Sequence, residues 1–319
     1  MNIDILNALN VDVEKDAHLS NYTTFQLGGR CPFLVFCRNS HEVKGVVSLL
    51  LKEKMNFMLM GLGSNLLISD AGVYCAVIRY VNDRPQIQAD GLTLIVDAAT
   101  HLDDLVLFCA ENGLSGLNFA SGIPGTVGGA VCGNAGAFGK QISDVLFSVD
   151  LISRKGMVQK NVDSQTLGFS YRHSFMKENG SVILSAKFIL KTADKKALLK
   201  ERQEILDLRK RKHPDYSLLP TAGSFFRNIE SSSQADKRKS AGWYLEEAGA
   251  QELDFNGAAL FPKHANIIVK TSDCSAQDVF DLSEEMKKRV KEKFNIDLIR
   301  EVRFAGKFKG QEKETRLIW

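Results

Sequence analysis

The chain has 319 residues, of which 44% are hydrophobic and 25% charged, and its formal net charge is +3. This composition indicates a soluble globular protein of more than one domain and excludes a largely disordered chain. No segment reaches the roughly 20 apolar residues of a spanning helix and the N-terminus lacks a secretory signal, so we expect a cytoplasmic protein with no membrane or nucleic-acid partner.

The N-terminal part of the chain predicts a β-α-β unit. Residues 32–38 have strand character, and Asn39 is a suitable N-cap for a helix with apolar residues at 43, 46, 47, 50 and 51. A second strand, 57–60, leads into the loop Gly61–Asn65, whose N–H groups and small side chains suit a phosphate. Strands at 74–80 and 92–98 and a helix at 102–112 follow.

Glycine is concentrated in one segment, residues 113–139, which holds nine of the 25 glycines. Such a segment must turn sharply or lie against a ligand, and we expect a loop with one short helix. Together with Gly61–Asn65, it indicates a large phosphorylated cofactor. The Gly61 loop lacks the third glycine and the following helix of a dinucleotide fingerprint, and neither loop contains Gly-Lys-Ser/Thr, so a Rossmann site is disfavoured and a P-loop is excluded.

The second half of the chain predicts further α+β structure. We expect strands at 147–152, 182–190, 267–270 and 297–304, and helices at 195–211, 241–249 and 276–293. Six cysteines occur without CxxC or paired spacing, which argues against a disulfide framework and against a zinc site. The thiols are therefore expected to be reduced and mostly buried.

Seven motifs occur in an order that closely resembles the UDP-N-acetylenolpyruvoylglucosamine reductases, flavoenzymes of bacterial peptidoglycan precursor synthesis. They are Tyr22–Gly29, Gly61–Leu66, Gly122–Ala130 with Gly133–Gly136, Phe169–Ser174, Ala222–Asn228, His264–Asn266 and Arg300–Phe304. The resemblance runs from about Asn21 to Gly306. One glycine loop is a weak signal, but seven motifs in one order make coincidence improbable.

The resemblance implies an α+β, multi-domain FAD-binding fold of the PCMH/vanillyl-alcohol-oxidase-like type with a C-terminal α+β substrate-binding domain. We expect a first FAD-binding subdomain at residues 1–78, against which the tail 305–319 packs. A second FAD-binding subdomain is expected at 79–205, and the substrate-binding domain at 206–304.

The resemblance also implies the cofactors, FAD with NADPH as hydride donor. The Gly61 loop is expected to hold the pyrophosphate and the Gly122 loop to approach the flavin, because glycine lets main-chain donors reach a ligand. The expected cofactor-binding residues are Thr23, Thr24, Gly61, Leu62, Gly63, Ser64, Asn65, Gly122, Ile123, Pro124, Gly125, Thr126, Gly128, Gly129, Ala130, Gly133 and Asn134.

Three residues match the catalytic positions of the family: Arg172, Ser224 and Glu301. Hydride addition at C3 of an enolpyruvyl ether leaves negative charge at C2 and on the carboxylate, and this charge must be stabilised and then protonated. The resemblance implies that Arg172 binds the substrate carboxylate, Ser224 donates the proton and Glu301 polarises the group or stabilises the enol. Taken alone, each residue also fits a structural role, respectively an ion pair, a turn residue and a rim carboxylate.

The implied substrate is a UDP sugar nucleotide, for which Tyr171, Lys212, Arg227, Asn228, His264 and Asn266 are the candidate contacts. Lys212 matches a family lysine that contacts the diphosphate, whereas the direct roles of His264 and Asn266 are left open. No tyrosine lies between Tyr171 and Lys212, so the chain resembles the shorter, type II form without the tyrosine that closes over the diphosphate. The family implies a monomer.

Two alternatives remain from the sequence. One is an oxidase of the same flavin-binding superfamily with a covalent flavin link, for which the nearby residues are His101, Cys109 and Cys132. The other is a flavin- or nucleotide-binding regulator that has lost its chemistry, which the joint presence of Arg172 and Glu301 with the serine disfavours.

Overall fold

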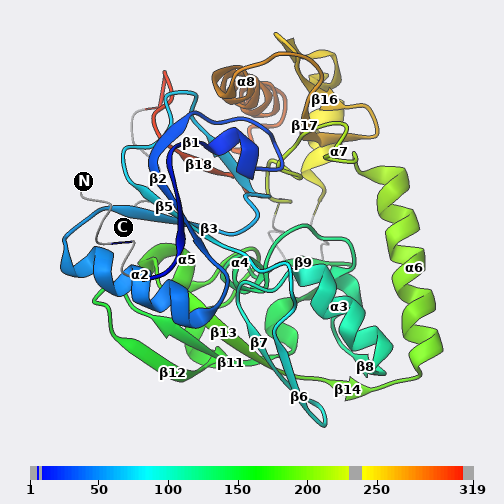
Figure 1. Ribbon diagram of the computed structural model, residues 1–319. Helices are drawn as coiled ribbons and strands as arrows, with labels where there is room; N and C mark the ends of the chain where they lie inside the picture. Colours follow the sequence, from blue (N-terminus) through cyan, green and yellow to red (C-terminus); the bar gives the residue numbers. More distant parts are fainter. Residues whose placement is uncertain (1–5, 7–8, 230–238, 312–319) are drawn as a thin grey trace.

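The structure is a computed structural model that describes residues 6, 9–229 and 239–311 (Figure 1). Its N-terminal sheet has the order β1-β2-β5-β3, in which β5 is parallel to both β2 and β3. The strands are β1 Asp12–His18, β2 Arg30–Cys37, β3 Phe57–Met60 and β5 Ala76–Tyr80. Helix α2 (Ser40–Lys52) connects β2 to β3, and the Asn39 side chain accepts a hydrogen bond from the Glu42 N–H at its start. The predicted β-α-β unit and N-cap are confirmed, whereas the edge strand β1 was not predicted.

A second sheet is antiparallel throughout and has the order β12-β11-β13-β7-β6. Its strands are β6 Ile87–Asp90, β7 Thr93–Asp97, β11 Leu146–Ile152, β12 Val158–Asp163 and β13 Val182–Ile189. In Figure 1, helix α4 (Val127–Gly133) lies between this sheet and the upper part of the molecule, and helix α3 (Leu102–Glu111) lies to the right of the sheet, next to the helix 195–212. The short helix expected within the glycine-rich segment is therefore α4.

Several short elements complete this part of the chain. They are the strand pairs β8 Leu114–Ser115 with β14 Lys191–Thr192 and β9 Gly136–Ala137 with β10 Lys140–Gln141, the helix α5 Phe175–Asn179, and the 3-10 helices Leu19–Tyr22, Asn118–Ala120, Ile142–Asp144 and Ser164–Leu167. One continuous hydrophobic core extends from Leu6 to Leu190 and includes α2, α3 and both sheets.

The long helix α6 (Lys195–Lys212) leads to a third group of elements, seen at the top of Figure 1. Its antiparallel sheet has the order β15-β16-β17, and it is accompanied by two helices and a 3-10 turn. These elements are β15 Asp254–Phe255, β16 Ala258–Phe261, β17 His264–Lys270, α7 Ala241–Glu247, α8 Ala276–Phe294 and the turn Ala250–Glu252. Their core also takes in Phe25, Leu27 and Leu67 from the N-terminal part, so distant segments are packed together.

The strand expected at 297–304 was wrong in extent, because only β18 (Arg303–Ala305) is a strand. The Glu301 N–H donates to the Phe225 carbonyl at 2.8 Å, whereas the Arg303 N–H donates to the Asn65 carbonyl at 3.0 Å. The chain therefore changes partner between these two residues, and this change interrupts the strand. Beyond it, β18 runs parallel to β4 (Leu66–Ile68).

Two features bear on the expected class of protein. All six cysteines are free, and four of them are buried, as the sequence predicts. Within the described ranges, no helix combines the length and the apolar character that crossing a bilayer requires.

Candidate active site

The two predicted glycine loops contact each other. The Ser64 hydroxyl donates to the Pro124 carbonyl at 2.8 Å. A Cβ at Gly61 would lie 2.8 Å from the Thr126 hydroxyl oxygen, and one at Gly63 would lie 2.6 Å from the Tyr22 carbonyl oxygen. Glycine is therefore required at these positions because three loops pack together there. The sequence had suggested a different reason, namely close approach of a ligand.

The Gly61 loop has the donors that a pyrophosphate needs. Among the described residues, the backbone N–H groups of Leu62, Gly63, Ser64 and Asn65 donate to no acceptor. Successive main-chain N–H groups without acceptors form an anion-binding concavity. The loop thus fits the pyrophosphate of FAD.

The segment after the Gly122 loop is held mostly by its own packing. Thr126 caps α4 by accepting from the Gly129 N–H, and a Cβ at Gly128 would lie 3.0 Å from the Cβ of Ala98. Gly133, in contrast, borders open space. Among these predicted cofactor contacts, Gly133 has the most open surroundings.

Asn134 is completely buried, and its side chain is already bonded. Its amide donates to the Ser170 carbonyl at 2.9 Å and accepts from the Ser143 N–H at 3.0 Å. The residue therefore supports the turn that follows Ser170, and its direct contact with a cofactor stays a prediction.

The Thr23–Thr24 pair connects the N-terminal part to the third group of elements. The Thr24 hydroxyl donates to the Thr221 carbonyl at 2.7 Å, and the Thr221 N–H donates back to the Thr24 carbonyl at 3.1 Å. Thr23 is buried and donates to the Leu27 carbonyl. This connection positions the chain just before Ser224.

Arg172 lies in a tight turn and points at Glu301. Ser170 and His173 exchange two backbone hydrogen bonds of 3.2 Å, and Arg172 between them has a φ of 56°, which is unusual for a residue other than glycine. Its Nε lies 2.9 Å from Glu301 Oε1, and its Nη2 donates to the Gly136 carbonyl at 2.6 Å. Among the described residues, Nη1 has no hydrogen-bond partner and remains available to an anion.

The Glu301 carboxyl lies in a strongly charged but sheltered position. Its side chain and that of Arg172 are each 20% exposed. Burial raises the pKa of Glu301, and this effect outweighs the opposing influence of the Arg172, Lys177 and Arg227 charges. A share of the carboxyl is therefore protonated at a higher pH than for an ordinary glutamate.

Ser224 begins a short extended segment that lies between β17 and the chain at 299–301. The Phe225 N–H donates to the Asn266 carbonyl at 2.7 Å, and the Phe225 carbonyl accepts from the Glu301 N–H at 2.8 Å. No hydrogen bond joins the Ser224 hydroxyl to another described residue. Phe225, the residue directly after Ser224, is therefore hydrogen-bonded through its backbone to Glu301. The Glu301 carboxyl in turn contacts Arg172.

The side chain of Asn266 forms hydrogen bonds with the backbone of this segment. It is 2% exposed, its amide oxygen accepts from the Phe226 N–H at 2.9 Å, and its amide nitrogen donates to the Phe226 carbonyl at 2.8 Å. Asn228 likewise accepts from the Ala241 N–H at the start of α7. Both predicted substrate contacts thus have structural hydrogen bonds of their own.

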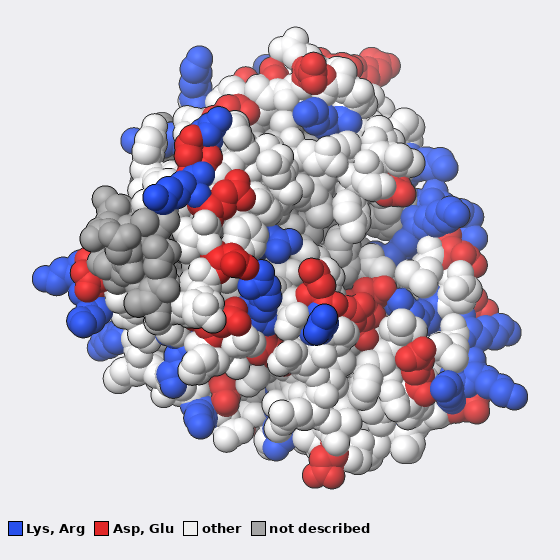
Figure 2. All heavy atoms as spheres, viewed as in Figure 1, with Lys and Arg blue, Asp and Glu red and all other residues white. Residues whose placement is uncertain are grey.

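Other predicted substrate residues border the same region. The Arg172 guanidinium lies 5.1 Å from the centre of the Tyr171 ring, and the His213 and His264 rings are 5.6 Å apart. Lys212 is exposed in the last turn of α6, one residue before His213. Figure 2 shows basic side chains gathered over this helix, while the rest of the visible face mixes both signs of charge.

Two basic residues near Glu301 were not predicted as site residues. Lys177 on α5 donates from Nζ to the Arg172 carbonyl at 2.9 Å. Arg303 lies on β18, and burial lowers the pKa of its guanidinium. The strand expected at 297–304 would place Arg303 on the same side as Glu301, but the observed strand begins only at Arg303, so alternation does not relate the two residues. Nothing in the sequence pattern marked Lys177.

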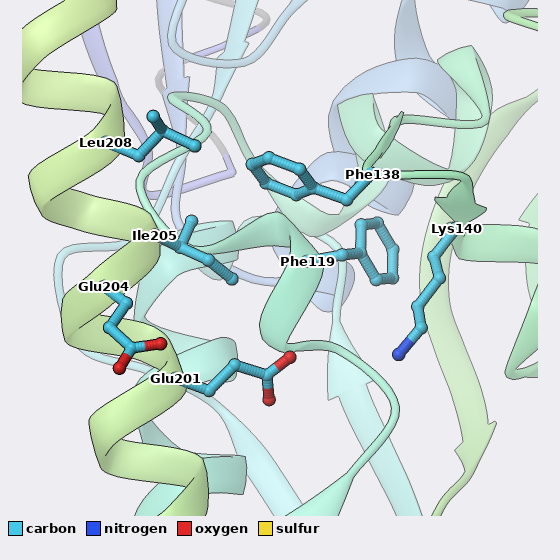
Figure 3. A pocket seen from close by; sticks show the side chains of 7 residues that line it. All are labelled: Phe119, Phe138, Lys140, Glu201, Glu204, Ile205 and Leu208. Carbon is cyan, nitrogen blue, oxygen red and sulfur yellow. The ribbon is translucent and has the colours of Figure 1, made fainter.

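A cavity of about 330 Å³ lies elsewhere, beside α6. Figure 3 shows Phe119 and Phe138 facing Ile205 and Leu208 across it, with Lys140, Glu201 and Glu204 at its rim. It contains none of the predicted site residues, so the site is better defined by the contacts around Glu301.

The residues considered for a covalent flavin link are poorly suited to it. Cys109 is 1% exposed within α3, and burial raises the pKa of its thiol to about 12. Burial also raises the pKa of Cys132. His101 precedes α3, with its Nε2 3.5 Å from Asp83. A thiol held in its protonated form is a poor nucleophile, which weakens the oxidase alternative.

Comparisons with known proteins agree with this arrangement. Residues 32–161 match a family model described as an FAD binding domain, and residues 213–305 match the C-terminal domain of UDP-N-acetylenolpyruvoylglucosamine reductase. A reductase of that name from Lactobacillus acidophilus is 36% identical over 93% of this chain and 96% of its own length. One from Streptococcus pneumoniae is 32% identical over 96% of this chain and 98% of its own.

A solved structure adds evidence for the fold. The crystal structure of UDP-N-acetylenolpyruvylglucosamine reductase from Thermus caldophilus is 31% identical and superposes with a TM-score of 0.73. The match covers 92% of this chain and 98% of that one. The similarity therefore includes all three groups of elements.

Proposed function

The chain belongs to the family of UDP-N-acetylenolpyruvoylglucosamine reductases, and on this basis we propose that Arg172, Ser224 and Glu301 are its catalytic residues. The protein is an FAD-containing oxidoreductase that uses NADPH. It reduces the enolpyruvyl ether of UDP-N-acetylglucosamine-enolpyruvate to UDP-N-acetylmuramate in peptidoglycan precursor synthesis. The observation that carries the residue assignment is the 2.9 Å contact between Arg172 and Glu301 beside the segment of Ser224.

Bound FAD supplies the hydride that is added to C3 of the enolpyruvyl group. Arg172 then stabilises the negative charge that develops at C2 and on the substrate carboxylate, since its Nη1 is left for an anion while Nε and Nη2 are fixed by Glu301 and Gly136. Fixed donors aimed at developing charge need no reorganisation during the reaction.

Glu301 and Ser224 complete the reaction as proton carriers. Burial raises the pKa of Glu301, so this carboxyl takes up a proton more readily than an ordinary glutamate, and once protonated it could donate a hydrogen bond to the enol-like oxygen. The unbonded hydroxyl of Ser224 can deliver its proton to C2, because an electron-rich enolate demands little acidity from its donor.

The free main-chain N–H groups of the Gly61 loop and the open space at Gly133 support FAD binding at these positions. Lys212 is proposed to contact the diphosphate of the sugar nucleotide from the end of α6. We further propose three units at 1–78, 79–205 and 206–304, a monomer, and a cytoplasmic location, where the sugar nucleotide and NADPH are found. Size-exclusion chromatography with light scattering tests the monomer.

The assignment is tested by separating the two half-reactions. Glu301→Gln and Ser224→Ala should each bind FAD and still be reduced by NADPH under anaerobic conditions. Re-oxidation by the enolpyruvyl sugar nucleotide should slow by about 10² to 10⁴. Glu292→Gln and Ser217→Ala, both at exposed positions outside the site, serve as matched controls.

Near-native re-oxidation in Glu301→Gln or Ser224→Ala would remove that residue from the mechanism. A purified protein that neither contains nor acquires a flavin absorption spectrum with added FAD would contradict the whole function. The two results are independent, because the second is measured before any substrate is added.

A further inference from the structure

Lys177 is tied to the turn that carries Arg172. Helix α5 (Phe175–Asn179) starts three residues after Arg172, and Lys177 Nζ donates to the Arg172 carbonyl at 2.9 Å. Arg172 has a left-handed backbone, which is unfavourable for a residue with a Cβ. Lys177 thus bonds back to the residue five positions earlier in the chain and holds its strained backbone in place.

Lys177 is also surrounded by the charges of the site. Arg227 and Arg303 lie close enough to disfavour its positive charge, and Glu301 and Cys132 favour it. Burial, with the two arginines, lowers the pKa of Lys177 to about 8. Its ammonium in turn acts on Glu301, whose carboxyl it favours in the charged form.

A partly buried lysine in such a position requires an explanation. Removing an ammonium from water and placing it near two arginines is unfavourable, and a single bond to a carbonyl compensates it only in part. A polar side chain that only fixed the turn would not need to be charged. The negative charge that develops on the substrate beside Arg172 and Glu301 would supply the missing compensation.

We propose that Lys177 is a positioning residue for reduction of the enolpyruvyl substrate: its ammonium fixes the Arg172 turn and provides positive charge beside Glu301. The inference rests on the function proposed above. It extends the site to α5, an element that was not predicted from the sequence.

The charge of Lys177 has a definite pH dependence. Below its pKa the amine is protonated and the positive charge is present, and above it the charge is lost while the neutral amine can still donate a hydrogen bond. Re-oxidation of the reduced enzyme by substrate should therefore slow as the pH rises through about 8. The hydrogen bond alone would predict no such decline.

The test measures substrate re-oxidation of the FAD-loaded enzyme from pH 6.5 to 10 by stopped-flow. Lys177→Met should be slower at pH 7 by about tenfold or more and show no decline near pH 8. Lys177→Arg remains charged throughout and should keep most of the rate at pH 7 without the alkaline decline. Lys160→Met changes an exposed lysine on β12, away from this turn, and should behave as the native protein.

Each outcome bears on the proposal. If native enzyme is not re-oxidised by the substrate at pH 7, the proposed function itself fails. If native enzyme is re-oxidised but Lys177→Met matches it, or Lys177→Arg keeps the decline at the native midpoint, the role of Lys177 is refuted. Should Lys177→Met not fold, as judged by flavin content and thermal unfolding, the profile of Lys177→Arg decides alone.

Discussion

The side-chain amide of Asn65 donates a 3.2 Å hydrogen bond to the backbone carbonyl of Glu301, although 236 residues separate the two in the chain. The Arg303 N–H returns a bond of 3.0 Å to the Asn65 carbonyl. The loop proposed to bind pyrophosphate and the segment that carries the proposed catalytic carboxyl are therefore joined directly. Cofactor binding and the position of Glu301 should be coupled.

Replacement of Asn65 by alanine should reveal this coupling. The change removes one partly buried hydrogen bond, worth about 1 kcal/mol, but leaves the main-chain donors of the loop. We expect FAD affinity to fall by roughly fivefold and substrate re-oxidation to slow with it, as measured by fluorescence titration and stopped-flow. Asn256→Ala, which removes a surface bond to Asp278, is the control. Native values for both quantities in Asn65→Ala would show that the two are not coupled.

Asn266 offers a test of how Ser224 is positioned. Asn266→Ala would leave both the N–H and the carbonyl of buried Phe226 without partners, so we expect a loss of about 2 to 4 kcal/mol in stability and a lower melting temperature. Re-oxidation should slow because the segment of Ser224 is no longer fixed, while reduction by NADPH in the remaining folded enzyme should be retained. Unchanged stability would contradict the structural role.

The sequence predicted the regular elements best where the pattern was strong. Helix α2 with its Asn39 cap, α3 and α8 were all predicted nearly to their ends, because apolar periodicity and end signals coincide there. The last strand was wrong in extent because Glu301 and Arg303 bond to different partners, a tertiary effect that no local pattern contains.

The candidate site was predictable only through motifs. Arg172, Ser224 and Glu301 were chosen because they match family positions, and the structure brings their segments together. The sequence could not show that the side chain of Asn266 is hydrogen-bonded to the backbone of Phe226, or that Lys177 Nζ donates to the Arg172 carbonyl. Both are side-chain contacts across a fold, and neither leaves a spacing signal.

Lys212 gives a prediction about the sugar nucleotide. Lys212 is exposed at the end of α6, and a lysine carries its positive charge on a flexible side chain, which suits a diphosphate. Lys212→Ala should raise the apparent KM for the enolpyruvyl substrate by about tenfold and leave flavin reduction by NADPH unchanged. Lys210→Ala, from the same turn of helix, is the matched control. An unchanged KM would assign Lys212 to the surface.

His213 predicts how stability depends on pH. Burial, reinforced by Arg209, His264 and Lys212, lowers the pKa of His213 to about 4 from an ordinary value of 6.5. Between these values the unfolded chain binds a proton that the folded protein does not, so stability is present above pH 6.5 and is lost as the pH falls toward 4.

Replacing His213 by glutamine should remove this pH-dependent contribution to the folding stability. Between pH 7 and pH 5 the melting temperature of the native holoenzyme should fall by about 2 °C more than that of His213→Gln, which corresponds to roughly 1 kcal/mol after allowance for solvent screening of a partly exposed ring. His264 stays in both proteins and shifts both alike, since burial also lowers its pKa. His41→Gln, on the exposed side of α2, should follow the native curve. Equal slopes for native protein and His213→Gln would mean that the ring is solvated enough to titrate normally.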